Sequence, residues 1–281
     1  MIKVLKSGFY TTIQDKGRVG FASLGIPVSG AMDSYSSDLA NLILNNSLDC
    51  ALLEITLGGC EFQFLSETMM CISGGDFSPA INNQPILLNS KVSIHKNDIL
   101  SFGKVNFGVR CYLAVKGGIL SDIKLGSRSL FKNITSNFLL KSGVFLPISN
   151  LKVDLGTSSS QVKVNKNHFD SKVIECFKGP EFEALDIHQQ KILSKTVFSV
   201  SKDINRMGYK LNEILENKIP SILTSAVLPG TVQLTPSGKL IVLMRDCQVT
   251  GGYPRVLQVS EESINRLSQK MTADKIQFVL Q

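Results

Sequence analysis

The segment Val109-Arg110-Cys111-Tyr112-Leu113-Ala114-Val115-Lys116 determines the fold class of this 281-residue chain. Apolar residues stand at every second position from Val109 to Val115, and Arg110, Tyr112, Ala114 and Lys116 stand between them. Side chains of a strand alternate between its two faces, so this pattern predicts a half-buried β-strand. Gly117-Gly118 follows at once, in a sequence typical of a turn.

Short β-rich runs recur on both sides of this segment. Clusters of Gly, Pro, Asn or Asp separate them, as is typical of sandwiches and barrels. The chain is therefore predicted to be mainly β with a few short helices. The further predicted strands are residues 52–57, 61–65, 68–73, 92–95, 173–177, 197–201, 231–235, 240–245 and 276–280.

Three helix starts can be identified. Asp33 is placed to cap a helix that runs to about Asn45. Pro180, followed by two glutamates, has the composition of a first helical turn. Ser260-Glu261-Glu262 predicts a third, short helix.

Composition and charge exclude several classes of protein. The chain is 43% hydrophobic, which is enough for a buried core, and its length suits about two domains or one large all-β or α/β domain. Its net charge of +7 is spread along the sequence without a basic run, so we do not expect nucleic-acid binding. Neither a signal peptide nor a membrane span is expected, since no apolar run is long enough. We expect a cytoplasmic protein whose six cysteines are reduced and mostly buried.

Common catalytic motifs are absent from the sequence. His95, His168 and His188 stand alone, so no metal site is expected. The residues before Ser29-Gly30 lack the first glycine of the GxSxG motif. Neither GxxxxGK[ST] nor GxGxxG occurs, so nucleotide binding cannot be inferred from a phosphate loop.

Polar residues instead gather beside glycines at six places. Each cluster alone is more typical of a turn cap or a structural ion pair, but six together suggest arginine–carboxylate pairs around a shared polar cleft. Glu54 stands inside an apolar strand, where burial requires a partner. The clusters are Thr11-Thr12-Ile13-Gln14-Asp15-Lys16-Gly17-Arg18, which we place at a turn, Leu53-Glu54-Ile55-Thr56-Leu57-Gly58-Gly59, Gly74-Gly75-Asp76, Gly126-Ser127-Arg128, Asn205-Arg206-Met207-Gly208-Tyr209 and Asp246-Cys247-Gln248-Val249-Thr250-Gly251-Gly252-Tyr253-Pro254.

These clusters, in this order, resemble the family of biotin-dependent carboxyltransferase-like proteins that is also called the KipA or allophanate hydrolase subunit 2 family. Gly25-Ile26-Pro27-Val28-Ser29-Gly30-Ala31-Met32-Asp33 and Leu113-Ala114-Val115-Lys116-Gly117-Gly118 also match, so the resemblance extends from residue 11 to residue 254. Two positions depart from it. Val249 replaces the first of two threonines, and Thr224-Ser225-Ala226 lacks an expected acidic residue, which suggests a divergent member.

The resemblance implies a fold and an assembly. It implies two cyclophilin-like β-barrel lobes, which we place at residues 1–155 and 156–281, with the boundary in a weakly hydrophobic stretch at 149–166. That stretch is interpreted as a linker, although a hairpin loop within one domain is the alternative. Members of the family act with a KipI-like partner protein (PxpB) and, in 5-oxoprolinase, with a further partner protein (PxpA).

The resemblance also implies an activity, with alternatives. The expected function is that of one component of a hydrolase, active only with its partners, that opens the cyclic amide 5-oxoproline to glutamate with ATP. The alternatives are a module of a biotin-dependent urea or amide carboxyltransferase or of allophanate hydrolase, and a KipA-like regulator that binds a KipI-like kinase inhibitor. Covalent biotin is not expected on this chain, because no Met-Lys pair occurs.

The candidate site residues fall into two groups. Three arginines would bind a carboxylate or phosphoryl group, and three aspartates would move or orient protons. These candidate catalytic residues are Arg18, Arg128, Arg206, Asp15, Asp76 and Asp246. The candidate substrate-binding residues are Gln14, Ser29, Gly30, Glu54, Gly74, Gly75, Asn205, Gln248, Thr250, Gly251, Gly252 and Tyr253.

Overall fold

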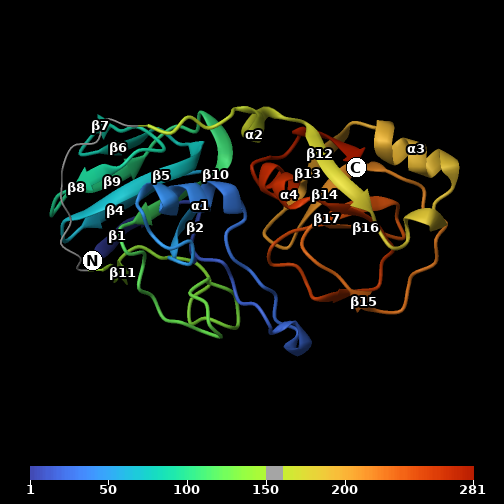
Figure 1. Cartoon of the computed structure of the whole chain (residues 1–281), viewed down its shortest axis with the longest axis horizontal. Helices are drawn as coiled ribbons and strands as arrows, with labels where there is room; N and C mark the ends of the chain where they lie inside the picture. Colours follow the sequence, from blue (N-terminus) through green and yellow to red (C-terminus); the bar gives the residue numbers. More distant parts are fainter. Residues whose placement is uncertain (150–160) are drawn as a thin grey trace. The chain divides into compact units, whose positions relative to one another are not determined.

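The computed structural model describes residues 1–149 and 161–281 and divides them into two compact units (Figure 1). Unit 1 comprises Met1–Arg18 and Ser29–Asn165, and unit 2 comprises Val19–Val28 and Lys166–Gln281. Segment 19–28 therefore belongs to the second unit although unit 1 residues flank it on both sides. The predicted boundary at residue 155 lies outside the described residues.

Unit 1 is built from two antiparallel sheets that enclose an apolar core. Ile2, Val4 and Phe62 from one sheet and Leu53 and Leu113 from the other belong to one buried cluster. The first sheet has the order β11 (Phe145–Leu146), β1 (Ile2–Ser7), β4 (Cys60–Phe64), β9 (Ile99–Phe102), β6 (Pro79–Ile81) and β7 (Gln84–Pro85). The second has the order β2 (Tyr10–Gln14), β3 (Leu52–Thr56), β10 (Phe107–Val115), β5 (Thr68–Asp76) and β8 (Val92–Ile94).

Strand β10 is buried on both faces from Val109 onward, so the prediction of a half-buried strand is wrong. Cys111 and Leu113 face the core between the sheets, whereas Tyr112 and Ala114 pack beneath helix α1 (Ser34–Ile43). The helix begins where Asp33 accepts a hydrogen bond from Ser36 N, as the sequence predicted. It covers the face that the alternation alone assigned to solvent.

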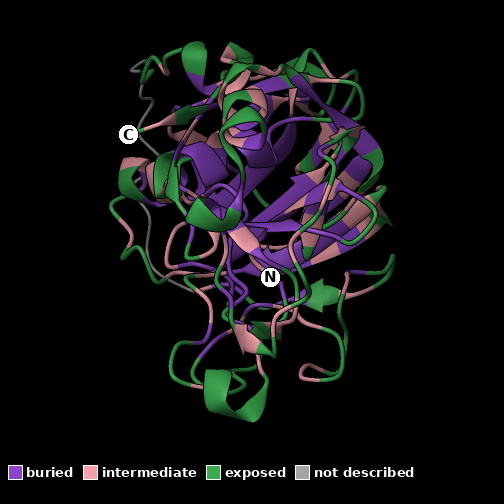
Figure 2. Cartoon of the chain, turned by 90° about the vertical axis from the view of Figure 1, so that its right-hand side faces the viewer, coloured by how far each residue is buried: buried purple, intermediate pink, exposed green. Residues whose placement is uncertain are grey.

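Unit 2 is a closed seven-stranded barrel. Its interior is filled by alternate, fully buried residues such as Val232, Leu234, Leu240 and Val242. Around the barrel run β12 (Val173–Lys178), β19 (Arg255–Val259), β16 (Thr231–Leu234), β17 (Lys239–Leu243), β14 (Gly208–Ile214), β13 (Phe198–Ile204) and β20 (Lys275–Leu280). Figure 2 shows exposed residues concentrated in loops and helices, with buried residues along the strands.

The remaining elements are short. A two-stranded ribbon pairs β15 (Ser225–Ala226) with β18 (Thr250–Gly251). Helix α4 (Glu261–Ser268) begins after its cap Ser260, as predicted. The helix predicted at Pro180 is instead the 3-10 turn η2 (Phe182–Ala184), and α3 (Ile187–Lys195) starts later because Asp186 and Gln189 form its capping box. The remaining helices are η1 (Ala22–Leu24) and α2 (Asn167–Asp170).

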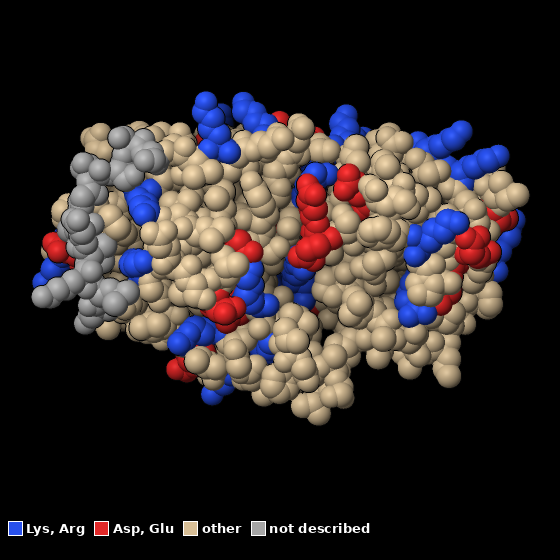
Figure 3. Space-filling view, in the orientation of Figure 1, with Lys and Arg blue, Asp and Glu red and all other residues tan. Residues whose placement is uncertain are grey.

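The mainly β fold class is confirmed, and each predicted strand is present to within about three residues at either end. Strand β2 was not predicted, and the turn expected within residues 11–18 starts at Asp15, directly after that strand. No helix in the part of the chain that is described has the length and apolar character to cross a membrane. Lys and Arg occupy several separate places on the face shown in Figure 3, with Asp and Glu near some of them.

Candidate functional site

Asp15 is the centre of a hydrogen-bonded cluster in unit 1. Its carboxylate accepts from Gly17 N at 2.8 Å, Ser127 Oγ at 2.6 Å, Arg128 N at 2.6 Å and Ser129 Oγ at 2.7 Å. The turn after β2 is thereby joined to residues 127–129, which are distant in sequence. Both carboxylate oxygens are occupied by donors from the protein itself, so Asp15 acts as an anchor for two loops.

Two neighbours of Asp15 in the sequence strengthen the same junction. The side chain of Arg18 is 1% exposed, and its guanidinium donates to the carbonyl of Ser129. Gln14 is fully buried, and its Nε2 donates to Thr12 Oγ1 at 3.1 Å. The side chain of Arg128 is partly exposed, and its backbone N–H is the group that bonds to Asp15.

The turn at Ser29-Gly30 packs directly against the Asp15 turn. Both residues have left-handed backbones, with φ of 62° and 87°, and a Cβ on Gly30 would lie 3.1 Å from the Asp15 carbonyl oxygen. Ala31 N donates to that same oxygen at 3.1 Å. Glycine at position 30 is therefore required both by its backbone conformation and by close contact.

Glu54 has the partners that its burial requires. Its carboxylate lies 3.8 Å from Arg110 Nε and accepts from Tyr112 Oη at 3.0 Å and from Met32 N at 2.7 Å. Burial, followed by the negative charge of Glu54, raises the pKa of Tyr112 well above its ordinary value. Tyr112 therefore remains a neutral donor to Glu54, and the cluster fixes the chain where it enters α1.

Gly74, Gly75 and Asp76 belong to the pairing of β5 with β10. A Cβ on Gly74 would lie 2.7 Å from the Arg110 carbonyl oxygen, at a place where the strand register shifts. Asp76 accepts from Ser78 N at 2.8 Å and from Asn106 Nδ2 at 2.9 Å. The hydrogen bonds described for Asp76 and for Asp15 share no residue, so they give no sign of a common cleft within unit 1.

In unit 2, Arg206 and Asp246 form a buried bidentate ion pair. Arg206 Nε lies 2.7 Å from Asp246 Oδ2, and a terminal nitrogen of its guanidinium lies 3.0 Å from Oδ1. Asp246 N also donates to the Arg206 carbonyl at 2.8 Å. These contacts hold the turn at residues 205–208 against the loop that follows β17.

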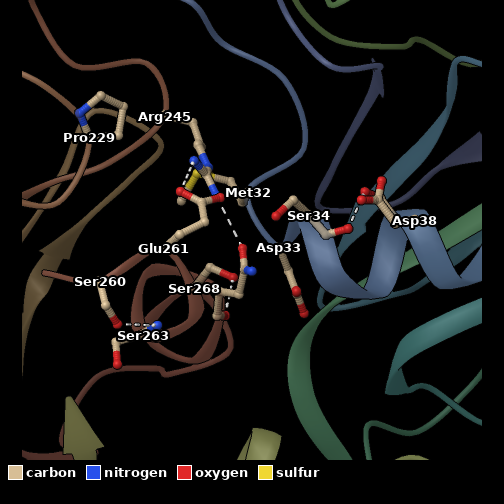
Figure 4. Close-up of polar contacts among 12 residues, drawn as sticks. Met32, Asp33, Ser34, Asp38, Pro229, Arg245, Ser260, Glu261, Ser263 and Ser268 are labelled. Carbon is tan, nitrogen blue, oxygen red and sulfur yellow. Dashed lines mark hydrogen bonds and ion pairs between the residues drawn. The ribbon is translucent and has the colours of Figure 1, made fainter. Parts of the chain in front are cut away.

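Arg245 fixes this loop on its other side. It donates to Glu261 Oε2 at 3.1 Å and to Asn265 Oδ1 at 3.1 Å, both on α4 (Figure 4). Ser260, at the start of that helix, accepts from Ser263 N at 3.2 Å. The loop at 244–247 thus has polar contacts on two sides, through Arg206, which the sequence analysis predicted, and through Arg245, which it did not select.

A pocket of about 480 Å³ lies beside this loop, and its volume is within the range of small-molecule sites. Its lining residues come from strands β13, β14, β16 and β17 and from the loop segments at 205–207 and 248–253. Three of the predicted substrate-binding residues, Asn205, Gln248 and Tyr253, line it. Its other lining residues are Lys202, Asp203, Ile204, Met207, Gly208, Lys210, Gln233, Ile241 and Leu243.

The polar wall of the pocket consists mainly of hydrogen-bond donors. Asn205 Oδ1 accepts from Met207 N at 2.7 Å and from Gly208 N at 3.2 Å, which leaves its NH2 group to act as a donor. Lys210 pairs with Asp203 at 3.3 Å, whereas no carboxylate among the described residues pairs with Lys202. The pocket can therefore hold a small ligand with carbonyl or carboxylate oxygens.

Gln233 is one of the pocket residues that the sequence analysis missed. It stands in β16 between Val232 and Leu234, which point into the barrel, so its own side chain points outward. A lone carboxamide in a short apolar strand was the available signal. Thr250, Gly251 and Gly252 lie in the segment between Gln248 and Tyr253, with Thr250 and Gly251 in β18.

A second, smaller cavity of about 250 Å³ lies in unit 1. Apolar residues, including Ile13, Leu130 and Leu146, form much of its wall. None of the predicted site residues lines it, so it supports no part of the sequence-predicted site.

The thiols and acidic groups do not form a metal or nucleophile site among the described residues. No group of three or more His, Cys, Asp or Glu there could hold a metal ion. All six cysteines are free, and burial raises the pKa of Cys60, Cys71, Cys176 and Cys247 to about 12. These four thiols are therefore protonated and weak nucleophiles at neutral pH.

Comparison with known proteins identifies relatives of the whole chain. The profile of the family described as carboxyltransferase domain, subdomain A and B, matches residues 24–280. The chain is 32% identical to the C subunit of 5-oxoprolinase of Escherichia coli (strain K12), over 99% of the chain and 91% of that protein. It is 44% identical to urea amidolyase of Lachancea kluyveri, over 46% of the chain and 7% of that protein.

A solved structure shows the same fold. The crystal structure of the K. lactis urea amidolyase matches 99% of the chain with a TM-score of 0.88 and 29% identity. The chain spans only 18% of the length of that protein.

Proposed function

The chain belongs to the family of the carboxyltransferase domain, subdomain A and B, and from this premise we propose that it is the C subunit of an ATP-dependent 5-oxoprolinase. The observation that carries the proposal is the extent of the match to the C subunit of the E. coli enzyme, which covers nearly all of both proteins. The urea amidolyases, by contrast, are far longer than the segment that they share with this chain.

The donor-rich pocket of unit 2 supports chemistry at a small amide. Opening of a lactam adds the elements of water across the C–N bond, and negative charge develops on the carbonyl oxygen during the addition. Fixed N–H donors that face this oxygen stabilise the transition state. Asn205 and Lys202, which both line the pocket, carry N–H groups that could serve as such donors once a ligand is bound.

We assign ATP to the assembled complex, without requiring that this chain binds it. The sequence holds neither of the glycine-rich phosphate motifs, and the pocket lies among strands instead of at a helix N-terminus. The KipI-like protein PxpB and the protein PxpA complete the proposed enzyme. The chain alone is therefore expected to show no turnover.

Reconstitution tests this proposal. The chain is mixed with PxpA, PxpB, ATP and 5-oxoproline, and glutamate release is measured with each component omitted in turn. We expect release only when every component is present. Full turnover without PxpB, or no release from the complete mixture, would contradict the proposal.

A biotin-dependent amide carboxyltransferase is the second candidate function. The higher local identity to urea amidolyase of Lachancea kluyveri favours it. The sequence has no Met-Lys pair for covalent biotin, so this function would need a separate carrier. Avidin distinguishes the two candidates: glutamate release that avidin leaves unchanged supports the oxoprolinase, and avidin-sensitive carboxylation of urea supports the transferase.

A further inference from the structure

The carboxamide of Gln233 is a buried group whose NH2 end has no hydrogen-bond partner among the described residues. The residue is 2% exposed, and its Nε2 has no hydrogen-bond partner in the structure described. Its Oε1 accepts a long bond of 3.4 Å from Gln248 Nε2. A buried amide N–H without a partner destabilises the folded state, so such groups are rare and call for a physical reason.

Gly251 provides the space beside this carboxamide. A Cβ at position 251 would lie 2.5 Å from Gln233 Nε2 and 3.6 Å from Gln248 Nε2. Gly251 is not among the glycines with positive φ, so its backbone conformation does not require glycine. A side chain at position 251 would therefore displace the Gln233 amide from its present place.

We propose that the Gln233 carboxamide binds the amide edge of a small lactam or ureide in the pocket of unit 2. In a lactam the ring holds the C=O and N–H on the same side, so the two groups form one donor–acceptor edge. A primary carboxamide carries the complementary edge, with Nε2 donating to the ligand carbonyl and Oε1 accepting from the ligand N–H. This inference rests on the proposed function, since it identifies which residue would recognise its amide substrate.

The ligand would displace the side chain of Gln248 from its hydrogen bond to Gln233. This side chain is exposed, and its hydrogen bond to Gln233 is long, so little is lost when the ligand N–H replaces it at Oε1. The ligand carbonyl then supplies the partner that Nε2 lacks. Lys202, which lines the same pocket, would face a carboxylate carried by the lactam ring.

Ligand-observed NMR on the full chain tests the amide-edge contact directly. The probes are 2-pyrrolidinone, 5-oxoproline and N-methyl-2-pyrrolidinone, which keeps the carbonyl but lacks the N–H. We expect the first two to bind and the N-methyl compound to bind at least about tenfold more weakly, because it leaves Oε1 without a donor. Equal binding of the N-methyl compound and 2-pyrrolidinone would overturn the proposal.

Two substitutions locate the contact. Gln233→Met keeps the length of the side chain but removes both hydrogen-bonding groups, and Gly251→Ala fills the space beside Nε2. Both should weaken 2-pyrrolidinone binding at least about tenfold, while Gln233→Met keeps or raises the melting temperature because an unsatisfied buried donor is gone. The matched controls are Gln63→Met in β4 and Gly103→Ala, where a Cβ would meet its nearest neighbour at 3.6 Å.

The possible failures can be told apart. Unchanged lactam binding by Gln233→Met overturns the inference, even if the complex still releases glutamate. Lactam binding that depends on Gln233, in a chain whose complexes never release glutamate, overturns the oxoprolinase and leaves the inference standing. If Gln233→Met does not fold, the comparison of N-methyl-2-pyrrolidinone with 2-pyrrolidinone on the unaltered chain still tests the amide-edge contact.

Discussion

The Asp15 cluster of unit 1 and the pocket of unit 2 contain similar residue types but use them differently. In the Asp15 cluster one carboxylate receives four donors from the protein, and the nearby Arg18 is directed to a backbone carbonyl. In the pocket, Gln233 Nε2 and the NH2 group of Asn205 remain available as donors. A polar cluster that is complete in itself supports the fold, whereas an incomplete one can bind a ligand.

A substitution of Asp246 tests whether the ion pair next to the pocket stabilises the fold, as the Asp15 cluster is expected to do. Asp246→Ala leaves the buried guanidinium of Arg206 without its carboxylate, so we expect the free energy of unfolding to fall by about 3–5 kcal/mol. Urea denaturation measures it. Asp203→Ala, which removes an exposed partner of Lys210, should cost no more than about 1 kcal/mol. Equal losses of unfolding free energy in Asp246→Ala and Asp203→Ala would contradict the structural role of the buried pair.

Asp15→Ala tests the unit 1 side of the comparison. It removes the acceptor for two backbone and two hydroxyl donors, so we expect a loss of about 2–3 kcal/mol in the free energy of unfolding. The control is Asp122→Ala, which removes an exposed aspartate close in sequence to residues 127–129. If Asp15→Ala kept full stability and lost only activity in the reconstituted complex, the role of Asp15 would be functional and not structural.

Glu181 and Arg255 form a partly exposed ion pair, so its contribution to stability should lie between those of the buried and the exposed pairs. The dependence of that contribution on pH provides a further test. Hydrogen bonds from Arg255 lower the pKa of Glu181 below its ordinary value of 4.5. A carboxyl whose pKa is lower in the folded state stabilises the protein above its unfolded pKa, and this stabilisation is lost as pH falls through the folded value. The stability difference between the unaltered chain and Glu181→Gln, about 1 kcal/mol at pH 7, should therefore shrink on acidification below pH 4.5. Thermal melts of both proteins at pH 7 and pH 3 measure this difference. If it were the same at both pH values, the lowered pKa of Glu181 would be refuted.

Gln248→Ala should have the smallest effect on the fold. Its side chain is exposed and makes one hydrogen bond of 3.4 Å, so the free energy of unfolding should change by no more than about 0.5 kcal/mol. Chemical denaturation checks this value. A larger loss would show that the polar wall of the pocket is structural, as the Asp15 cluster is.

Local patterns predicted the strands well because alternation and turn residues act over a few positions. They failed where a distant segment decides burial: the second face of β10 is covered by α1, which lies far earlier in the chain. They also failed at residues 11–14, where polar Thr and Gln side chains concealed strand β2, which is hydrogen-bonded to β3.

The candidate site was predictable to a similar degree. Asn205, Gln248 and Tyr253 were found because they stand beside glycines in recognisable clusters, and they do line one pocket. Gln233 was not found, because its importance depends on the glycine at position 251, which β16 meets only in the folded barrel. The sequence also could not separate carboxylates that anchor loops from those that remain open to a ligand, since that depends on donors supplied from far along the chain.

The assignment of segment 19–28 to unit 2 has a consequence for how the protein is made. On the ribosome this segment is made before most of unit 1 and long before the barrel with which it is grouped. A single break in the chain cannot release both units whole, because a cut in the region between them leaves segment 19–28 on the wrong fragment. Dissection of this protein into separately expressed halves would therefore require a rearranged gene in which that segment travels with the barrel.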